Sequence, residues 1–261
     1  MKNLLFIVAA GLVFGSCNSS TSAEDAVSEV VETVSTPKIT VSPKAPGMDF
    51  PDATITDWGF TDGDFKFDVD ASTYELGQQT ADASSIMCAN SGKGQHIHLI
   101  VDNKPYAAKY TPKFAYELED GDHQILAFLS RSYHESIKTP AAHRAVNATV
   151  AGNSFTKVEP ITNPMLFYSR PKGTYVGKDA QKLLLDFYPV NVQLDADHQV
   201  KVETNGETFM LDKWQPYVLE GLPMGENTVT LTLVDGEGKR IEAPHNPVSR
   251  TFSLQADPLS E

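Results

Sequence analysis

The chain has 261 residues, and its 34 acidic side chains outnumber its 21 basic ones to give a formal net charge of −13. This excess argues against nucleic acid as a partner and against electrostatic attachment to anionic lipid, because both require clustered Lys and Arg. The length exceeds one typical domain, and the hydrophobic fraction of 41% is enough for two modest cores.

The N-terminus has the pattern of an export signal. A short positive segment, Met1–Asn3, precedes the apolar run Leu4–Phe14, and small residues stand directly before Cys17. The apolar run is too short to span a membrane as a helix. The pattern resembles a bacterial lipoprotein signal, which implies that residues 1–16 are a signal peptide and that lipidated Cys17 begins the mature chain. The alternative, an ordinary secretory signal, also predicts export.

A lipid anchor would place the protein in the cell envelope, with the outer membrane as the expected site and its periplasmic or surface side left open. Residues 17–49 are rich in Ser, Thr, Ala, Glu, Val and Pro, and they predict a flexible tether. With Cys17 lipidated, Cys88 has no partner for an intramolecular disulfide. We expect Cys88 to be a small buried apolar group.

Residues 50–155 predict a first β-sandwich domain. Phe65, Phe67 and Val69 alternate with polar residues, which is the period of a half-buried strand. Acidic side chains lie at the alternate positions, but their spacing is not that of a calcium loop, and we expect a solvent-facing strand surface. Further alternating segments follow, with turn residues between them.

Residues 156–261 predict a second β-sandwich domain that repeats the first. The segment Gln199–Gly206 matches His96–Asn103 in pattern, and Thr228–Asp235 matches Gln124–Arg131. A repeat over this length indicates the fold more strongly than any single motif. Short strands at a spacing of about ten residues, separated by turn residues, are typical of β-sandwiches.

The predicted fold is therefore all-β, with two tandem immunoglobulin-like β-sandwich domains behind the signal and the disordered tether. The strand–turn–strand pattern resembles immunoglobulin-like or fibronectin-like modules of bacterial envelope proteins. The segment Gln95–Val150 also resembles a largely uncharacterised envelope domain family, in which a His-rich strand precedes an apolar run and an acidic turn residue. The residues that carry this resemblance are His96, His98, Leu99–Val101 and Asp102. It implies a fold and a location but no activity.

Histidines suggest a metal site in the first domain. His96 and His98 lie two residues apart on a strand, so both imidazoles share one face. A third ligand from a neighbouring segment would complete a copper or zinc site, and the candidates are His123, His134 and His143. The repeat matches the pair with Gln199 and Lys201, which predicts that both histidines project from the sandwich surface. The alternative is that they are ordinary exposed polar residues.

The segment between Ser130 and Arg144 predicts a polar surface loop. Loops at the end of a sandwich commonly carry recognition, and normal polar loop residues are the alternative. The candidates for binding a ligand are Arg131, Tyr133, His134 and Arg144.

The sequence carries no catalytic signature, because it has no Gly-x-Ser-x-Gly elbow and no nucleophile stands out. We therefore expect a lipid-anchored binding or scaffolding protein without a catalytic site, which engages a protein, peptide or glycan of the envelope. The alternative is a periplasmic or surface protein that binds copper or zinc through the histidines of the first domain.

Overall fold

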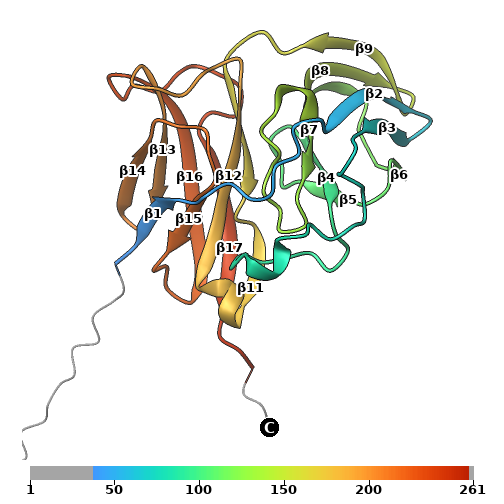
Figure 1. The fold of residues 1–261 in the computed structure, drawn as a ribbon. Helices are drawn as coiled ribbons and strands as arrows, with labels where there is room; N and C mark the ends of the chain where they lie inside the picture. Colours follow the sequence, from blue (N-terminus) through green and yellow to red (C-terminus); the bar gives the residue numbers. More distant parts are fainter. Residues whose placement is uncertain (1–37, 259–261) are drawn as a thin grey trace, which may run out of the picture. The chain divides into compact units, whose positions relative to one another are not determined.

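Strands dominate the described part of the chain, residues 38–258 of the computed structural model (Figure 1). The predicted signal peptide, Cys17 and the first part of the predicted tether lie outside these residues. All described residues belong to one compact unit, Thr36–Glu261. In this part of the chain no helix has the length and apolar character needed to cross a membrane.

The first sandwich consists of two antiparallel sheets. A three-stranded sheet has the order β2-β3-β6, and a five-stranded sheet has the order β5-β4-β7-β8-β9. The strands are β2 (Thr54–Thr61), β3 (Asp64–Asp70), β4 (His96–Val101), β5 (Ala107–Lys109), β6 (Lys113–Ala115), β7 (Gly121–Ser130), β8 (His143–Ala151) and β9 (Ser154–Pro160). Two short 3₁₀ helices are η1 (Ala83–Ser85) and η2 (Pro140–Ala142).

These two sheets enclose an apolar core. Phe65 and Phe67 of β3 point into the core, whereas Lys66 between them is exposed. On the facing sheet, Ile97 and Leu99 of β4 join the same core. The alternation predicted for β3 is confirmed, and burying each such large side chain stabilises the fold by about 1.5–3 kcal/mol.

The second sandwich also has two sheets. Their orders are β1-β15-β12-β10 and β11-β17-β16-β13-β14, with antiparallel neighbours except for the parallel pair β11 and β17. The elements are β1 (Thr40–Pro43), β10 (Met165–Arg170), β11 (Gly173–Val176), η3 (Gly177–Ala180), β12 (Lys182–Val190), β13 (His198–Thr204), β14 (Glu207–Leu211), β15 (Tyr217–Glu220), β16 (Gly225–Asp235) and β17 (Val248–Gln255).

The second sandwich repeats the central strands of the first. β4, β7 and β8 lie side by side, and so do β13, β16 and β17. Even the register agrees, because His98 pairs with Phe128 while its counterpart Lys201 pairs with Thr232. The predicted all-β fold with two β-sandwiches is confirmed.

The structure corrects two predicted boundaries. The predicted tether, residues 17–49, includes β1, which pairs with β15 so that Val41 lies opposite Leu219. Val41 also packs against the core of the second sandwich, and this apolar contact explains why the segment forms a strand. The predicted border between residues 155 and 156 falls inside β9, which pairs with β8 along its length.

A third apolar cluster joins the two sandwiches. Phe128, on the outer face of β7, stacks on Tyr188 of β12 with ring centroids 5.1 Å apart. Beside them, the Asn103 side chain donates to the Leu166 carbonyl at 2.8 Å and accepts from the Tyr168 amide at 2.9 Å, so the turn after β4 is fixed to β10. The outer face of β4 is therefore an internal surface.

Candidate metal centre

β4 places His96 and His98 on the face that packs against the second sandwich. Both residues are 0% exposed, so the predicted surface location is wrong. Their counterparts Gln199 and Lys201 are only partly buried. The repeat predicted correctly that the two histidines share the outer face of the sheet. The repeat could not indicate that β10 covers this face in the first sandwich, because β10 belongs to the second sandwich and is not one of the repeated strands.

A third histidine, from a distant turn, meets these two rings. Nε2 of His96 lies 2.8 Å from Nε2 of His98 and 3.0 Å from Nδ1 of His134. One ring nitrogen of each residue lies within 4.8 Å of the other two. Within residues 38–258 this is the only group of three or more His, Cys, Asp or Glu side chains that converges so closely.

The turn between β7 and η2 carries His134 into the cluster. The turn is closed by a β-bridge between Ser130 and Ser136, and the His134 amide donates to the Arg131 carbonyl at 2.9 Å. His134 has φ of +68°, in the left-handed region that costs a non-glycine residue about 1–2 kcal/mol. This backbone directs Nδ1 of His134 toward His96 and to within 3.2 Å of the Tyr106 hydroxyl.

Hydrogen bonds outside the cluster decide which nitrogen atoms face inward. Nδ1 of His96 donates to the Gly94 carbonyl at 2.8 Å, which leaves its Nε2 with a lone pair. Nδ1 of His98 lies 3.2 Å from Oγ of Ser169 on β10. Outer hydrogen bonds of this kind orient metal-binding histidines in proteins. The single lone pair of His96 Nε2 faces two ring nitrogens and can accept from only one, whereas a metal ion could bind all three.

Burial keeps the three rings neutral. It lowers the pKa of His96 to about 4, and it lowers the pKa values of His98 and His134 well below their usual range. The positive charges of Arg170 and Lys172 act in the same direction. At neutral pH the rings therefore present lone pairs, and neutral imidazole is the form that binds metals.

Aromatic rings wall the cluster. The Tyr106 ring stacks on His98 with centroids 3.6 Å apart, and the Tyr110 ring lies 4.9 Å from that of His96. Zinc–nitrogen bonds of about 2.0 Å set nitrogen atoms about 3.3 Å apart in a tetrahedral site. The two close contacts of His96, at 2.8 and 3.0 Å, would therefore have to open by about 0.3–0.5 Å. The nitrogens of His98 and His134 form no hydrogen bond with each other and lie within 4.8 Å, so they would have to move to about the same separation.

The other two predicted metal ligands lie elsewhere. His123 is held at the far end of β7, where Nδ1 lies 2.7 Å from a carboxylate oxygen of Asp102 and Nε2 lies 2.9 Å from the Glu119 carbonyl. The His143 ring packs against Tyr188, with ring centroids 4.8 Å apart. Of the five predicted ligands, the structure brings together only His96, His98 and His134.

The predicted recognition loop is an internal turn. Arg131 is 4% exposed and donates to backbone carbonyls of its own turn and of the segment before β2. Tyr133 is 1% exposed and donates to a carboxylate oxygen of Asp82 at 3.2 Å. Buried polar groups need partners, and Arg131 and Tyr133 find theirs inside the protein. Arg144 is half-buried on β8 and donates to the carbonyls of His143 and Ile55. Only His134 belongs to the cluster.

Several residues of the site were not predicted. Tyr106 follows the turn of the hairpin that begins with β4, and hairpin geometry could have placed it near His98. Ser169, Arg170 and Lys172 come from the second sandwich, and no local pattern marks them as neighbours of a strand in the first.

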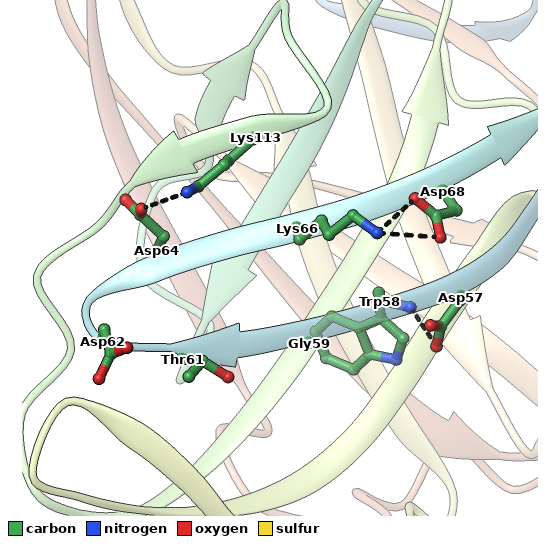
Figure 2. A pocket seen from close by; sticks show the side chains of 9 residues that line it. All are labelled: Asp57, Trp58, Gly59, Thr61, Asp62, Asp64, Lys66, Asp68 and Lys113. Atoms are coloured by element: carbon green, nitrogen blue, oxygen red, sulfur yellow. Dashed lines mark hydrogen bonds and ion pairs between the residues drawn. The ribbon is translucent and has the colours of Figure 1, made fainter.

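The acidic residues predicted on the solvent face of this strand region line a hollow on the outer face of β2 and β3 (Figure 2). Lys66 lies 3.1 Å from Asp68, and Lys113 of β6 lies 3.0 Å from Asp64. These pairs are well exposed, as expected for the solvent face of a strand. The alternation of charges explains the acidic pattern without a bound ion.

No protein-family model and no curated protein matches the chain. Among solved structures, fibronectin(III)-like modules of CbhA from Clostridium thermocellum are 16% identical over 36% of this chain and 100% of that chain, with a TM-score of 0.28. SGBP-B of the Bacteroides ovatus mixed-linkage glucan utilization locus, in complex with a heptasaccharide, is 9% identical over 84% of this chain and 71% of that chain, with a TM-score of 0.21. A Ca²⁺-stabilized adhesin of an Antarctic bacterium is 11% identical, and the match covers 75% of this chain and 44% of that chain with a TM-score of 0.23. Likeness at this level carries no conclusion about a ligand.

Proposed function

We propose that this protein is an exported, lipid-anchored binding protein of the cell envelope that holds one copper or zinc ion through His96, His98 and His134. One observation carries the proposal: three neutral ring nitrogens, from a strand and a distant turn, converge within 4.8 Å in the protein interior. Three imidazoles are a common donor set for zinc and copper.

The contacts inside the cluster support the same proposal. The lone pair of His96 Nε2 faces ring nitrogens of both His98 and His134 and can accept from only one of them, whereas a bound metal ion could take a lone pair from each of the three rings. His134 reaches the cluster with a left-handed backbone, a strained conformation of the kind that is often found at binding sites. The lack of a catalytic site and the protein, peptide or glycan partner stay predictions from the sequence.

Metal binding should raise the melting temperature of the full-length protein in detergent. A native-state ligand at one hundred times its dissociation constant stabilises by about 2.7 kcal/mol, which corresponds to roughly 5–10 °C for a protein of this size. We expect this shift with zinc or copper, and we expect it to disappear in His98→Ala and in His134→Ala. The measurement is a thermal unfolding scan with and without the metal.

His123→Ala is the matched control, because His123 lies in the same sandwich but outside the cluster. It should keep the full metal-induced shift. No shift for the wild type, or equal shifts for the wild type and His98→Ala, would refute the proposed function.

The lipid anchor is tested separately at Cys17. Cys17→Ser removes the thiol that the lipoprotein signal would modify, so the variant should move from the membrane fraction to the soluble fraction. Fractionation followed by immunoblotting measures the distribution. Unchanged membrane retention would contradict the anchor without affecting the metal site.

A further inference from the structure

The donor set of the three-histidine cluster contains no negative charge. Among the described residues, no carboxylate forms a hydrogen bond or an ion pair with His96, His98 or His134. Their polar contacts are with each other, with the Gly94 carbonyl, and with the hydroxyl groups of Ser169 and Tyr106. A metal ion bound there would keep its whole charge, because neutral imidazoles do not cancel it.

Two cations pack against Tyr106, the ring that stacks on His98. Nζ of Lys172 lies 4.0 Å above the Tyr106 ring and donates to the Tyr106 carbonyl at 2.9 Å. The Arg170 guanidinium lies 5.7 Å from the same ring, on which His98 stacks. Repulsion between these cations and a bound metal grows in proportion to the charge of the metal. A divalent ion is therefore disfavoured twice as strongly as a monovalent one.

The enclosure of the site adds to this discrimination. His96 and His98 are fully buried, His134 is 9% exposed, and Tyr106 and Phe128 pack on the His98 ring. Zinc bound by three histidines normally keeps a fourth ligand, usually water or an anion. Cu⁺ is stable with three nitrogen donors, carries one charge and needs no such fourth ligand.

We propose that the cluster of His96, His98 and His134 selects Cu⁺ over Zn²⁺, and that Lys172 and Arg170 set this selectivity by charge repulsion. This inference rests on the proposed function, because it specifies the metal held by the same three residues. It assigns to two residues of the second sandwich a role in choosing the ligand of the first.

The experiment measures both affinities on the full-length protein in detergent at pH 7. Cu⁺ affinity is obtained under anaerobic reducing conditions by competition with a chromogenic Cu⁺ chelator, and Zn²⁺ affinity by competition with a zinc chelator. We expect Cu⁺ to bind about a hundredfold more tightly, with each of the two cations contributing about tenfold. His134→Ala should lose both metals.

Lys172→Met tests the charge mechanism, because Met keeps much of the packing and removes the cation. It should raise the Zn²⁺ affinity about a hundredfold and the Cu⁺ affinity about tenfold. The ratio of the Cu⁺ affinity to the Zn²⁺ affinity should therefore fall about tenfold. Lys109→Met is the matched control, since Lys109 lies over Phe114 on the opposite face of the sheet. It should leave both affinities unchanged.

The outcomes separate the two proposals. If Zn²⁺ binds at the histidines as tightly as Cu⁺, or if Lys172→Met leaves the preference unchanged, the inference about selectivity is overturned and the proposed function stands. If neither metal binds, both are overturned. A Cu⁺ preference that narrows in Lys172→Met but not in Lys109→Met supports the inference.

Discussion

Acidifying the metal-free protein from pH 7 to pH 4 is expected to lower its free energy of unfolding steeply, and His96 alone should contribute about 3 kcal/mol of the loss. Burial lowers the pKa of His96 from 6.5 in the unfolded chain to about 4 in the folded protein. Each unit of pKa difference corresponds to about 1.4 kcal/mol. The pKa values of His98 and His134 are lowered in the same direction.

The sign follows from which state binds more protons. Above pH 6.5 the histidines are neutral in both states, and the folded protein keeps its full stability. As the pH falls below 6.5, the histidines of the unfolded chain bind protons while those of the cluster in the folded protein stay neutral. The folded state is therefore progressively destabilised relative to the unfolded state. For His96 the loss is complete once the pH falls below about 4.

Urea unfolding at a series of pH values measures this effect. His96→Gln removes one titrating ring, so its stability should fall by about 3 kcal/mol less than that of the wild type between pH 7 and pH 4. Comparing the two proteins cancels the contribution of carboxylates that titrate in the same range. Parallel pH curves for the two proteins would contradict the predicted burial of a neutral cluster.

Replacing Asp186 by Ala is expected to destabilise the protein by about 3–5 kcal/mol, which corresponds to roughly 10 °C in melting temperature. Asp186 on β12 is 0% exposed and lies 2.7 Å from Nζ of Lys138. It also accepts from the Ser136 hydroxyl at 3.0 Å and from the Ser136 amide at 3.3 Å. Removing the carboxylate leaves the amide and hydroxyl of Ser136 buried without this acceptor, and it leaves Lys138, whose side chain is 18% exposed, without its counter-charge.

The loss of stability should extend to the three-histidine cluster, because Ser136 closes the turn that carries His134. Asp68→Ala is the matched control: it breaks a pair with Lys66 that is exposed to solvent, and such pairs contribute less than about 1 kcal/mol. Chemical denaturation measures both variants. A loss below about 1 kcal/mol for Asp186→Ala would show that this ion pair does not hold the two sandwiches together.

Local patterns predicted the strands well because side-chain alternation is a property of each strand by itself. The placement of Phe65 and Phe67 in the core required only a period of two residues. The match between Gln199–Gly206 and His96–Asn103 predicted a common strand position, and in the structure the pairing register of the two strands also agrees. β1 was missed because its partner β15 lies far ahead in the chain, and a short strand in a polar segment has no distinctive local pattern.

The candidate site was predicted only in part. The spacing of His96 and His98 placed both rings on one face, and His134 was among the proposed third ligands. The sequence could not distinguish His134 from His123 or His143, because the path of each turn depends on contacts outside it. The polar residues around His134 were interpreted as a recognition surface. In the structure Arg131 and Tyr133 are buried, and they form hydrogen bonds inside the protein.

By itself the sequence determined the strand pattern, the repeat and the shared face of the two histidines, since all three follow from backbone geometry over a few residues. Only the tertiary structure decided that this face is internal. Nδ1 of His98 meets Ser169, a residue 71 positions away, because β10 packs across β4. That packing removes water from the imidazoles and brings Arg170 and Lys172 against Tyr106, the ring that stacks on His98. It turns two histidines that would be exposed on an isolated sandwich into part of a buried, neutral three-nitrogen cluster.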